Sequence, residues 1–203
     1  MEMEKTKEVY YQSLYELAET LNSSRVPEAI LQSIVEGVAK AMEAKGCSLM
    51  ILSPDRKVLF HTVAYGLSDW YVKKGPVSAD KSISEALEGK AIAVYDATED
   101  YRVQYRSQAK KEGIMSVLSV PMELRESVIG VIRVYTAERR QFTMDDMYFV
   151  GAVANLGAIA LENARLYEAL QKDYEAFRRD MLEWRAALGH EWIVGESVTP
   201  SEK

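Results

Sequence analysis

The sequence predicts an α+β protein in which two helices, a β-hairpin, an irregular excursion, a second hairpin and a long helix follow one another. Three observations carry this prediction. Residues 116–135 contain two β-rich segments joined by a short polar turn, and residues 47–64 contain a similar pair. Apolar residues at helical spacing occupy 7–45 and the stretch after 143. Because the strands of each pair are close in sequence, we expect both pairs to be antiparallel.

Composition and charge restrict the class of protein. The chain has 203 residues, of which 48% are hydrophobic and 28% charged, which is typical of a globular protein with a sizeable core. A net charge of −6 argues against a nucleic-acid surface. No segment approaches the roughly 20 apolar residues of a membrane span. The charged N-terminus lacks an apolar signal core, so we expect a cytoplasmic protein with no membrane partner.

The N-terminal region predicts two amphipathic helices. Apolar side chains recur at helical spacing over 7–22 and again over about 26–45. Pro27 falls in the first turn of the second helix, where its missing N–H would be unpaired in any case. Gly46 follows the last periodic residue, so it is the expected C-terminal glycine of that helix.

A first hairpin follows. Strands are expected over 47–52 and 58–64, and the connection between them contains proline and aspartate, which favour a turn. Cys47 opens the first strand as a small buried hydrophobe. It is the single cysteine of the chain, so neither an intramolecular disulfide nor a cysteine-based zinc cluster can form.

Residues 66–114, called the excursion from here on, are punctuated by glycine and proline. They contain a short helix over 83–87, an apolar segment over 91–95 and a charged helix over 101–112. Such long segments of short elements in a compact domain are usually functional loops or lids.

The second hairpin contains one residue that breaks its pattern. Residues 128–135 are an almost continuous apolar run, typical of a strand covered on both faces. Arg133 interrupts that run, and a guanidinium among β-branched neighbours needs a partner or water. Alternation places Val131, Arg133 and Tyr135 on one face of the strand. A small-molecule site is therefore expected near Arg133.

The C-terminal helix is expected to begin at Thr143, whose hydroxyl can cap it, with Asp145 and Asp146 in its first turn. From Ile159 one side of the helix carries residues at intervals of 4, 3, 4, 4, 3, 4, 3 and 4, which resembles a coiled coil with one four-four step. This stripe consists of Ile159, Asn163, Leu166, Leu170, Tyr174, Phe177, Met181, Trp184 and Leu188. Either a second copy of the chain covers this stripe and forms a homodimer, or the end of the helix folds back onto its own chain. The expected interface residues are Leu14, Leu17, Leu166, Leu170, Tyr174, Phe177, Met181 and Trp184.

Three short sequence segments, in this order along the chain, resemble the GAF domain family, a group of sensory modules related in architecture to PAS domains. They are SVLSVP at 116–121, VIGVI at 128–132 and LENARLY at 161–167. Asp96 followed by 100–102 is also similar to the family. The resemblance covers about residues 10–170. It implies a GAF/PAS-like central antiparallel sheet, with helices from both termini on one face and a loop and helix excursion over the other. We expect a GAF domain over 1–170, a helical extension over 171–194 and a disordered tail over 195–203.

In this family, ligands bind between the sheet and the excursion, so the resemblance implies that Arg133 faces the pocket. Its planar fork would pair an anionic group such as a carboxylate. The expected pocket residues are Arg133, Tyr135, Val131, Ser119, Val117, His61, Tyr65, Trp70, Ile83 and Tyr95. Two alternatives stay open. Arg133 could form an internal salt bridge to an acid such as Asp96 or Asp100, and the aromatic residues could be ordinary core.

The activities known in the family find little support in these residues. Relatives that reduce methionine sulfoxide need several cysteines, and bilin-binding relatives use a cysteine in or near the excursion, where this chain has none. The Asn-Lys…Phe-Asp-Glu pattern of cyclic-nucleotide-binding relatives is absent. His61 and His190 are too distant in sequence for metal-ligand spacing. We therefore expect no catalytic residues and no metal ligands, and the sequence identifies no cofactor.

The resemblance predicts a non-enzymatic sensory domain that binds a small molecule and signals through a helical dimer. Few residues follow 167, so the output is expected in a separate protein, or the chain is part of a longer one. A ligand-free dimerisation or protein-interaction module is the alternative. A small-molecule enzyme is the third hypothesis.

Overall fold

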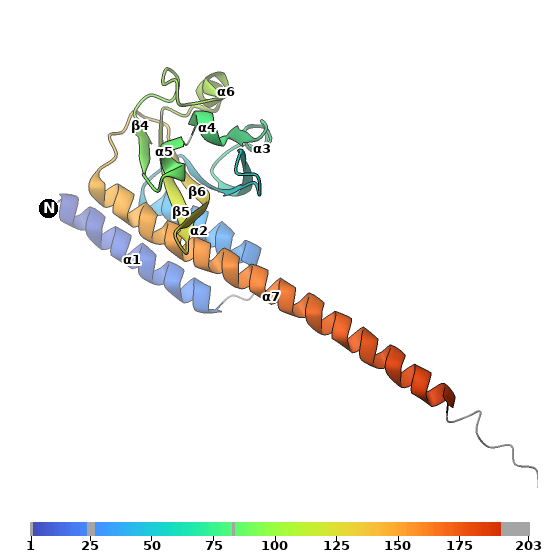
Figure 1. Ribbon diagram of the computed structural model, residues 1–203. Helices are drawn as coiled ribbons and strands as arrows, with labels where there is room; N and C mark the ends of the chain where they lie inside the picture. Colours follow the sequence, from blue (N-terminus) through green and yellow to red (C-terminus); the bar gives the residue numbers. More distant parts are fainter. Residues whose placement is uncertain (1, 24–26, 83, 192–203) are drawn as a thin grey trace, which may run out of the picture. The chain divides into compact units, whose positions relative to one another are not determined.

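The computed structural model describes residues 2–23, 27–82 and 84–191 (Figure 1). In chain order the elements are α1 (Glu2–Ser23), α2 (Pro27–Ala41), β1 (Gly46–Leu52), β2 (Val58–Tyr65), α3 (Asp69–Val72), β3 (Val77–Ser78), α4 (Ala79–Ser82), α5 (Ser84–Leu87), β4 (Ile92–Val94), α6 (Arg106–Glu112), β5 (Ser116–Leu124), β6 (Ser127–Thr136) and α7 (Met144–Glu191).

The chain forms two compact units, Met1–Leu161 and Glu162–Lys203. The first holds the sheet, α1 to α6 and the first part of α7, and the second holds the rest of that helix. Since α7 continues unbroken past residue 170, the domain limit predicted there stays a prediction. The predicted tail over 195–203 lies outside the described residues.

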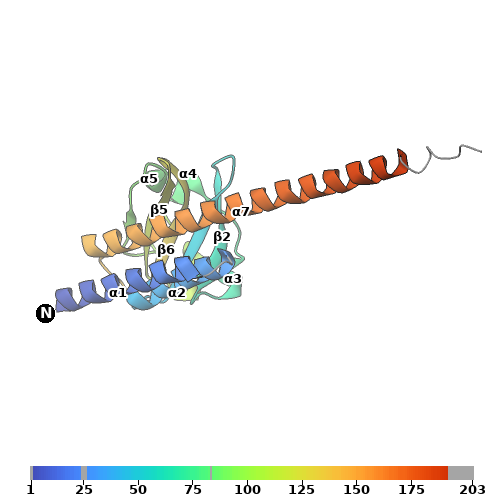
Figure 2. The same cartoon turned by 90° about the horizontal axis from the view of Figure 1, so that it is seen from below.

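The first unit is built around a single antiparallel sheet. Its strand order is β3-β2-β1-β6-β5-β4, so β1 and β6 are its central strands. Both predicted hairpins are present, as β1–β2 and β5–β6. Figures 1 and 2 show α1, α2 and the first part of α7 on one face of the sheet, with α3 to α6 on the other. The predicted α+β architecture is confirmed.

Each face of the sheet has its own core, because successive side chains of a strand point to opposite faces. Ile132 and Val134 of β6 pack in the core under the helices. Val131 and Tyr135 of the same strand pack in the core under the excursion. The predicted division of this strand between two faces is therefore present, and Arg133 lies between Val131 and Tyr135 on the excursion side.

The start of α7 is anchored by a buried carboxylate. The Asp146 N–H donates to the Thr143 hydroxyl (3.2 Å), and the Thr143 N–H donates to Asp146 Oδ2 (2.7 Å), as the predicted cap requires. The hydroxyl of Tyr10 in α1 donates to Asp146 Oδ1 (2.5 Å), and Arg140 Nη2 donates to the same oxygen (2.9 Å). Asp146 is 2% exposed, so this network ties α1 to α7 inside the protein.

Two predicted helix limits are wrong for local reasons. Gly46 does not end α2, because Glu43 takes the left-handed conformation (φ 49°) and the Ala44 N–H closes the turn on the Ala39 carbonyl (2.8 Å). The charged helix predicted over 101–112 begins only at Arg106, in α6. Ahead of it, the Asp100 carboxylate accepts the Arg102 N–H and forms a turn instead.

One helix is long and apolar enough to cross a membrane by length and composition alone. An 18-residue window within Met144–Ala187 has a mean hydropathy of 1.2, and 44% of it is buried inside the protein. Ala154 and Ala158 are among the residues by which α7 packs in the helical core. A buried core helix meets the same criterion, so the expected absence of a membrane partner stays a prediction.

Candidate functional site

The candidate site is centred on Arg133 in the middle of β6. Ser48 of β1 and Ser119 of β5 lie directly opposite Arg133 in the two neighbouring strands, and both serines are buried. Residues opposite one another in neighbouring strands point to the same face. Ser48 Oγ lies 3.0 Å from the hydroxyl oxygen of Tyr135. This face of the sheet therefore presents hydroxyl groups on both sides of a guanidinium.

Lys74, between α3 and β3, brings a second cation to the site. Its Nζ lies 3.1 Å from His61 Nε2 and donates to the Tyr71 carbonyl oxygen (2.9 Å). The same nitrogen lies 3.6 Å from the centroid of the Tyr71 ring, a cation–π contact. Tyr71 is buried and meets Tyr135 edge to face, with 6.1 Å between ring centroids. The excursion thus places an ammonium and an aromatic ring over the sheet.

Positive charge dominates the electrostatics of the site. Burial, together with the charges of Lys74 and Arg133, lowers the pKa of His61 to about 3. Burial and the Arg133 charge lower the pKa of Lys74 to about 7, although Glu112 partly offsets this. The Glu112 carboxylate accepts hydrogen bonds from the Ser68 N–H (2.8 Å) and the Ser68 hydroxyl. Both shifts mean that positive charge is disfavoured here unless an anion compensates it.

His61 has one ring nitrogen that can serve a ligand. Because Nε2 faces the Lys74 ammonium, the neutral ring is best assigned with its proton on Nδ1. Among the described residues, this buried Nδ1 has no hydrogen-bond partner. A donor of this kind is costly to leave unmatched. Lys74, Arg133 and His61 therefore bring three nitrogen donor groups to the excursion-facing side of the sheet.

The family model for the GAF domain matches residues 24–162, well over half of the chain. This chain belongs to the GAF domain family. A methyl sulfide methyltransferase-associated sensor from Methanosarcina acetivorans is 26% identical over 139 residues, covering 65% of this chain. Those residues are only 14% of that sensor's length.

Solved structures share the fold at low identity. The GAF domain of a phosphoenolpyruvate-protein phosphotransferase from Coxiella burnetii has a TM-score of 0.72 at 19% identity, covering 80% of this chain and 98% of that one. A free methionine-R-sulfoxide reductase from Neisseria meningitidis, in complex with its substrate, has a TM-score of 0.65 at 15% identity. That match covers 78% of this chain and 91% of the reductase.

The GAF fold brings together six of the ten residues predicted for the pocket. They share the excursion-facing surface of the sheet: Val117, Ser119, Val131, Arg133 and Tyr135 by strand alternation, and His61 beside Met50. Ile83 lies outside the described residues. Tyr65, Trp70 and Tyr95 are not part of this buried surface, each for a local reason in the backbone.

Tyr65 lies on the opposite face from His61, although the two are four residues apart in one strand. A β-bulge shifts the pairing between Leu49 and Met50, which face Val63 and His61 respectively. The extra residue reverses the alternation, so Tyr65 packs against the helical core. The expected place of Tyr65 in the pocket is corrected.

Trp70 and Tyr95 are 40% and 53% exposed, so neither belongs to the buried core under the excursion. In α3 the inward position belongs to Tyr71, and the Trp70 ring instead lies under Lys111 Nζ, 4.7 Å from its centroid. In β4 the inward residue is Val94, so the next residue, Tyr95, faces outward.

The site also contains residues that the sequence did not single out. Lys74 and Tyr71 lie in the excursion, whose short elements show no clear period. Lys73, directly before Lys74, is an exposed neighbour that pairs with Asp69 (3.7 Å). Nothing in the residue types distinguishes the two lysines, because only the turn of α3 decides which one points inward.

The carboxylates considered as partners of Arg133 pair with other arginines. Arg139 Nη2 donates to Asp96 Oδ2 (2.6 Å), and Arg102 Nη2 donates to Asp100 Oδ2 (2.7 Å). Hydrogen bonds from Thr98 and Arg139 lower the pKa of Asp96 to about 2. These two acids are therefore paired with Arg139 and Arg102, and an internal salt bridge from Arg133 to another acid stays an open alternative.

Cys47 lies on the other face of the sheet from this site. It is fully buried in the helical core, and burial raises the pKa of its thiol. A protonated, enclosed thiol is a poor nucleophile. In the described part of the chain, no group of three or more His, Cys, Asp or Glu residues could hold a metal ion.

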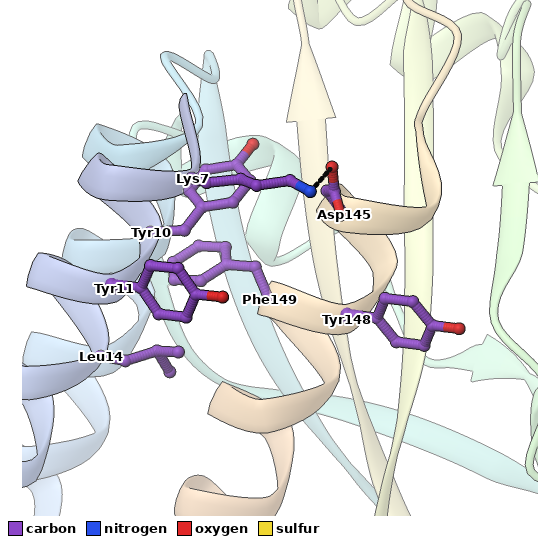
Figure 3. Close-up of a pocket in the computed structure, with 7 residues that line it drawn as sticks. All are labelled: Lys7, Tyr10, Tyr11, Leu14, Asp145, Tyr148 and Phe149. Atoms are coloured by element: carbon purple, nitrogen blue, oxygen red, sulfur yellow. Dashed lines mark ion pairs between the residues drawn. The ribbon is translucent and has the colours of Figure 1, made fainter. Parts of the chain in front are cut away.

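A separate hollow of about 180 Å³ lies on the helical side, between α1 and the start of α7. Figure 3 shows Lys7 reaching across it to Asp145, at 3.3 Å. Leu14 lines this hollow, whereas Leu17 is 5% exposed and packs in the core of its own unit. The prediction that Leu17 forms a dimer interface is therefore wrong.

Proposed function

We propose that this GAF domain is a cytoplasmic, non-enzymatic sensory module that binds a small anion between the sheet and the excursion. The bound anion would bias a helical homodimer, which signals to a separate output protein. The observation that carries this proposal is the meeting of Lys74, Arg133 and His61 in one largely buried place. The likeness to a Methanosarcina sensor supports the signalling role.

A carboxylate fits these donors best. The planar guanidinium of Arg133 can donate two parallel hydrogen bonds to its two oxygens. Ser48 and Ser119 stand on either side as further hydroxyl donors, and the Tyr71 and Tyr135 rings can cover the apolar part of the molecule. An anion would also compensate the Lys74 ammonium, whose charged form burial disfavours.

Binding should depend on Lys74 and not on its neighbour. We expect acetate, pyruvate or succinate to bind, and Lys74→Gln or Arg133→Gln to weaken that binding roughly 10- to 150-fold, as loss of one charge-assisted hydrogen bond does. Lys73→Gln is the matched control, since Lys73 is exposed. Isothermal titration calorimetry gives the affinities, with inorganic phosphate as a second anion. Equal affinities in all four proteins would refute the site.

Carboxylate binding should weaken as the pH rises. Lys74 has a pKa of about 7, so the protonated fraction falls from about 90% at pH 6 to about 10% at pH 8. We expect a roughly tenfold loss of affinity over that interval and a flat profile in Lys74→Gln. His61, with a pKa of about 3, stays neutral throughout. A slope that persists in Lys74→Gln would assign the titration to another group.

The ligand-free protein should become more stable when Lys74 loses its charge. Its pKa of about 7 lies below the ordinary 10.5, so protonation opposes folding. We expect Lys74→Met to raise Tm by a few degrees, for about 1 kcal/mol. The gain should be full below pH 7 and shrink towards pH 10.5, where the unfolded wild type also becomes neutral. Calorimetry at pH 6 and pH 10 tests this; a lower Tm at pH 6 would contradict it.

A ligand-free interaction module is the second candidate. One observation favours it: Tyr71, Leu59, Val77 and other side chains of the chain itself fill the core under the excursion. If none of the four anions binds and Lys74→Met still folds, this second function replaces the first.

A further inference from the structure

We infer that residues 162–187 of α7 pair with the same segment of a second copy, parallel and in register. Asp173 and Asp180 of each chain then face Arg178 and Arg185 of the other. The inference deepens the dimeric output of the proposed function by assigning its orientation. The second unit of the chain carries it alone, with no role for the anion site.

A narrow apolar stripe runs along this segment. Its members follow one another at intervals of three or four residues, so they fall on one side of the helix. All of them are exposed within the chain, and Trp184 is 62% exposed. The stripe consists of Leu166, Leu170, Tyr174, Phe177, Met181 and Trp184. A helix with such a seam is stable in water when another helix covers it.

The charges on either side of the stripe favour a second copy of the same helix as the surface that covers it. In heptad terms, Met181 is an a position and Phe177 and Trp184 are d positions. Asp173 and Asp180 then occupy g positions, directly before the a residues Tyr174 and Met181. Arg178 and Arg185 occupy e positions, directly after the d residues.

In a parallel, in-register dimer, each g residue faces the e residue five positions later in the partner helix. Asp173 therefore faces the partner's Arg178, and Asp180 faces the partner's Arg185. In an antiparallel pair, g faces g and e faces e. That arrangement would place aspartate beside aspartate and arginine beside arginine, so the charges favour the parallel arrangement.

Three of these four charges are poorly placed for pairing within their own helix. Ion pairs on a helix form between residues three or four positions apart. No basic residue lies at that spacing from Asp173 or Asp180, and no acidic residue lies at that spacing from Arg185. Arg179, on the opposite side, has Glu175 and Glu183 at four-residue spacing. Arg178 has Glu175 three residues before it, whereas Asp173, Asp180 and Arg185 are the stripe-side charges that only a second helix can pair.

Cysteine cross-linking of the full chain tests the orientation. We expect Met181→Cys to form a disulfide-linked dimer in most of the protein under mild oxidation, because both introduced thiols meet at the seam. Arg179→Cys carries the same thiol on the opposite side and should stay largely uncross-linked. The native Cys47 is fully buried and does not interfere. Equal cross-linking of the two variants, or none in Met181→Cys, would overturn the parallel arrangement.

Charge reversal tests the pairing itself. Asp173→Arg with Asp180→Arg sets arginine against arginine and should weaken the dimer at least tenfold in 50 mM NaCl, and less in 500 mM. Adding Arg178→Asp and Arg185→Asp should restore it. Analytical ultracentrifugation measures these dimer affinities without any ligand, so failure of anion binding leaves this result intact. A wild-type monomer at high concentration, or no response to charge reversal, would refute the inference.

Discussion

Asp146→Ala should destabilise the folded protein by about 3–4 kcal/mol, whereas Asp145→Ala, one residue earlier, should change the free energy of unfolding by less than about 1 kcal/mol. Asp146 is almost fully buried and accepts hydrogen bonds from Tyr10, Arg140 and Thr143. Its loss leaves a largely enclosed guanidinium without its carboxylate and removes the acceptor of the Thr143 N–H at the start of α7. Asp145 makes one partly exposed ion pair, to Lys7.

The two aspartates form a matched pair, because both lie in the first turn of α7 and interact equally with the helix dipole. Urea denaturation followed by circular dichroism gives both free energies. Tyr10→Phe, which removes one donor only, should fall between them at about 1–2 kcal/mol. Similar losses for Asp146→Ala and Asp145→Ala would show that the network does not anchor the helix.

Gly130→Ala should destabilise the protein by about 3 kcal/mol or more, at the upper end of what overpacking costs. Gly130 lies in β6 opposite Ile51 of β1, at the centre of the sheet. A Cβ there would lie 2.3 Å from the carbonyl oxygen of Met50. Since that atom belongs to the backbone of a central strand, the clash can be relieved only by moving the strand.

Gly151→Ala is the matched control in α7 and should stabilise the protein by about 0.5–1 kcal/mol. A Cβ at Gly151 meets only Val120 Cγ1, at 4.0 Å, and alanine restricts the unfolded chain more than glycine does. Chemical denaturation gives the free energy of unfolding of both variants. Their comparison separates the steric cost of a Cβ between two strands from the entropic effect of replacing glycine. Equal and small effects in the two variants would mean that β1 and β6 can move apart at Gly130 without loss of stability.

The order of elements could be predicted because each depends on neighbours in the chain. The hairpins β1–β2 and β5–β6 follow from short turns between apolar runs, and the cap at Thr143 follows from its own hydroxyl and a carboxylate three residues later. The division of β6 between two cores follows from simple alternation. Arg133 stood out for the same reason, since a charge within an apolar run is visible locally.

The rest of the site could not be predicted, because it depends on contacts between distant segments. The bulge opposite Leu49 and Met50 decides that His61 faces the site and Tyr65 does not, and it leaves no mark in the residue types. For a similar reason, the sequence does not show that Tyr71, and not Trp70, is the buried aromatic residue of α3. Four residues of helix are too few to show a period.

Local pattern therefore determined the antiparallel α+β scaffold, Arg133 in its central strand and the seam of the last helix, because strand alternation and helical spacing are written along the chain. Only the folded excursion decided that Lys74 would lie beside His61 and over Tyr71, on the face of the sheet that carries Arg133. Burial and the field of Arg133, which shift the pKa of Lys74 and of His61, arise from that assembly and from no single segment.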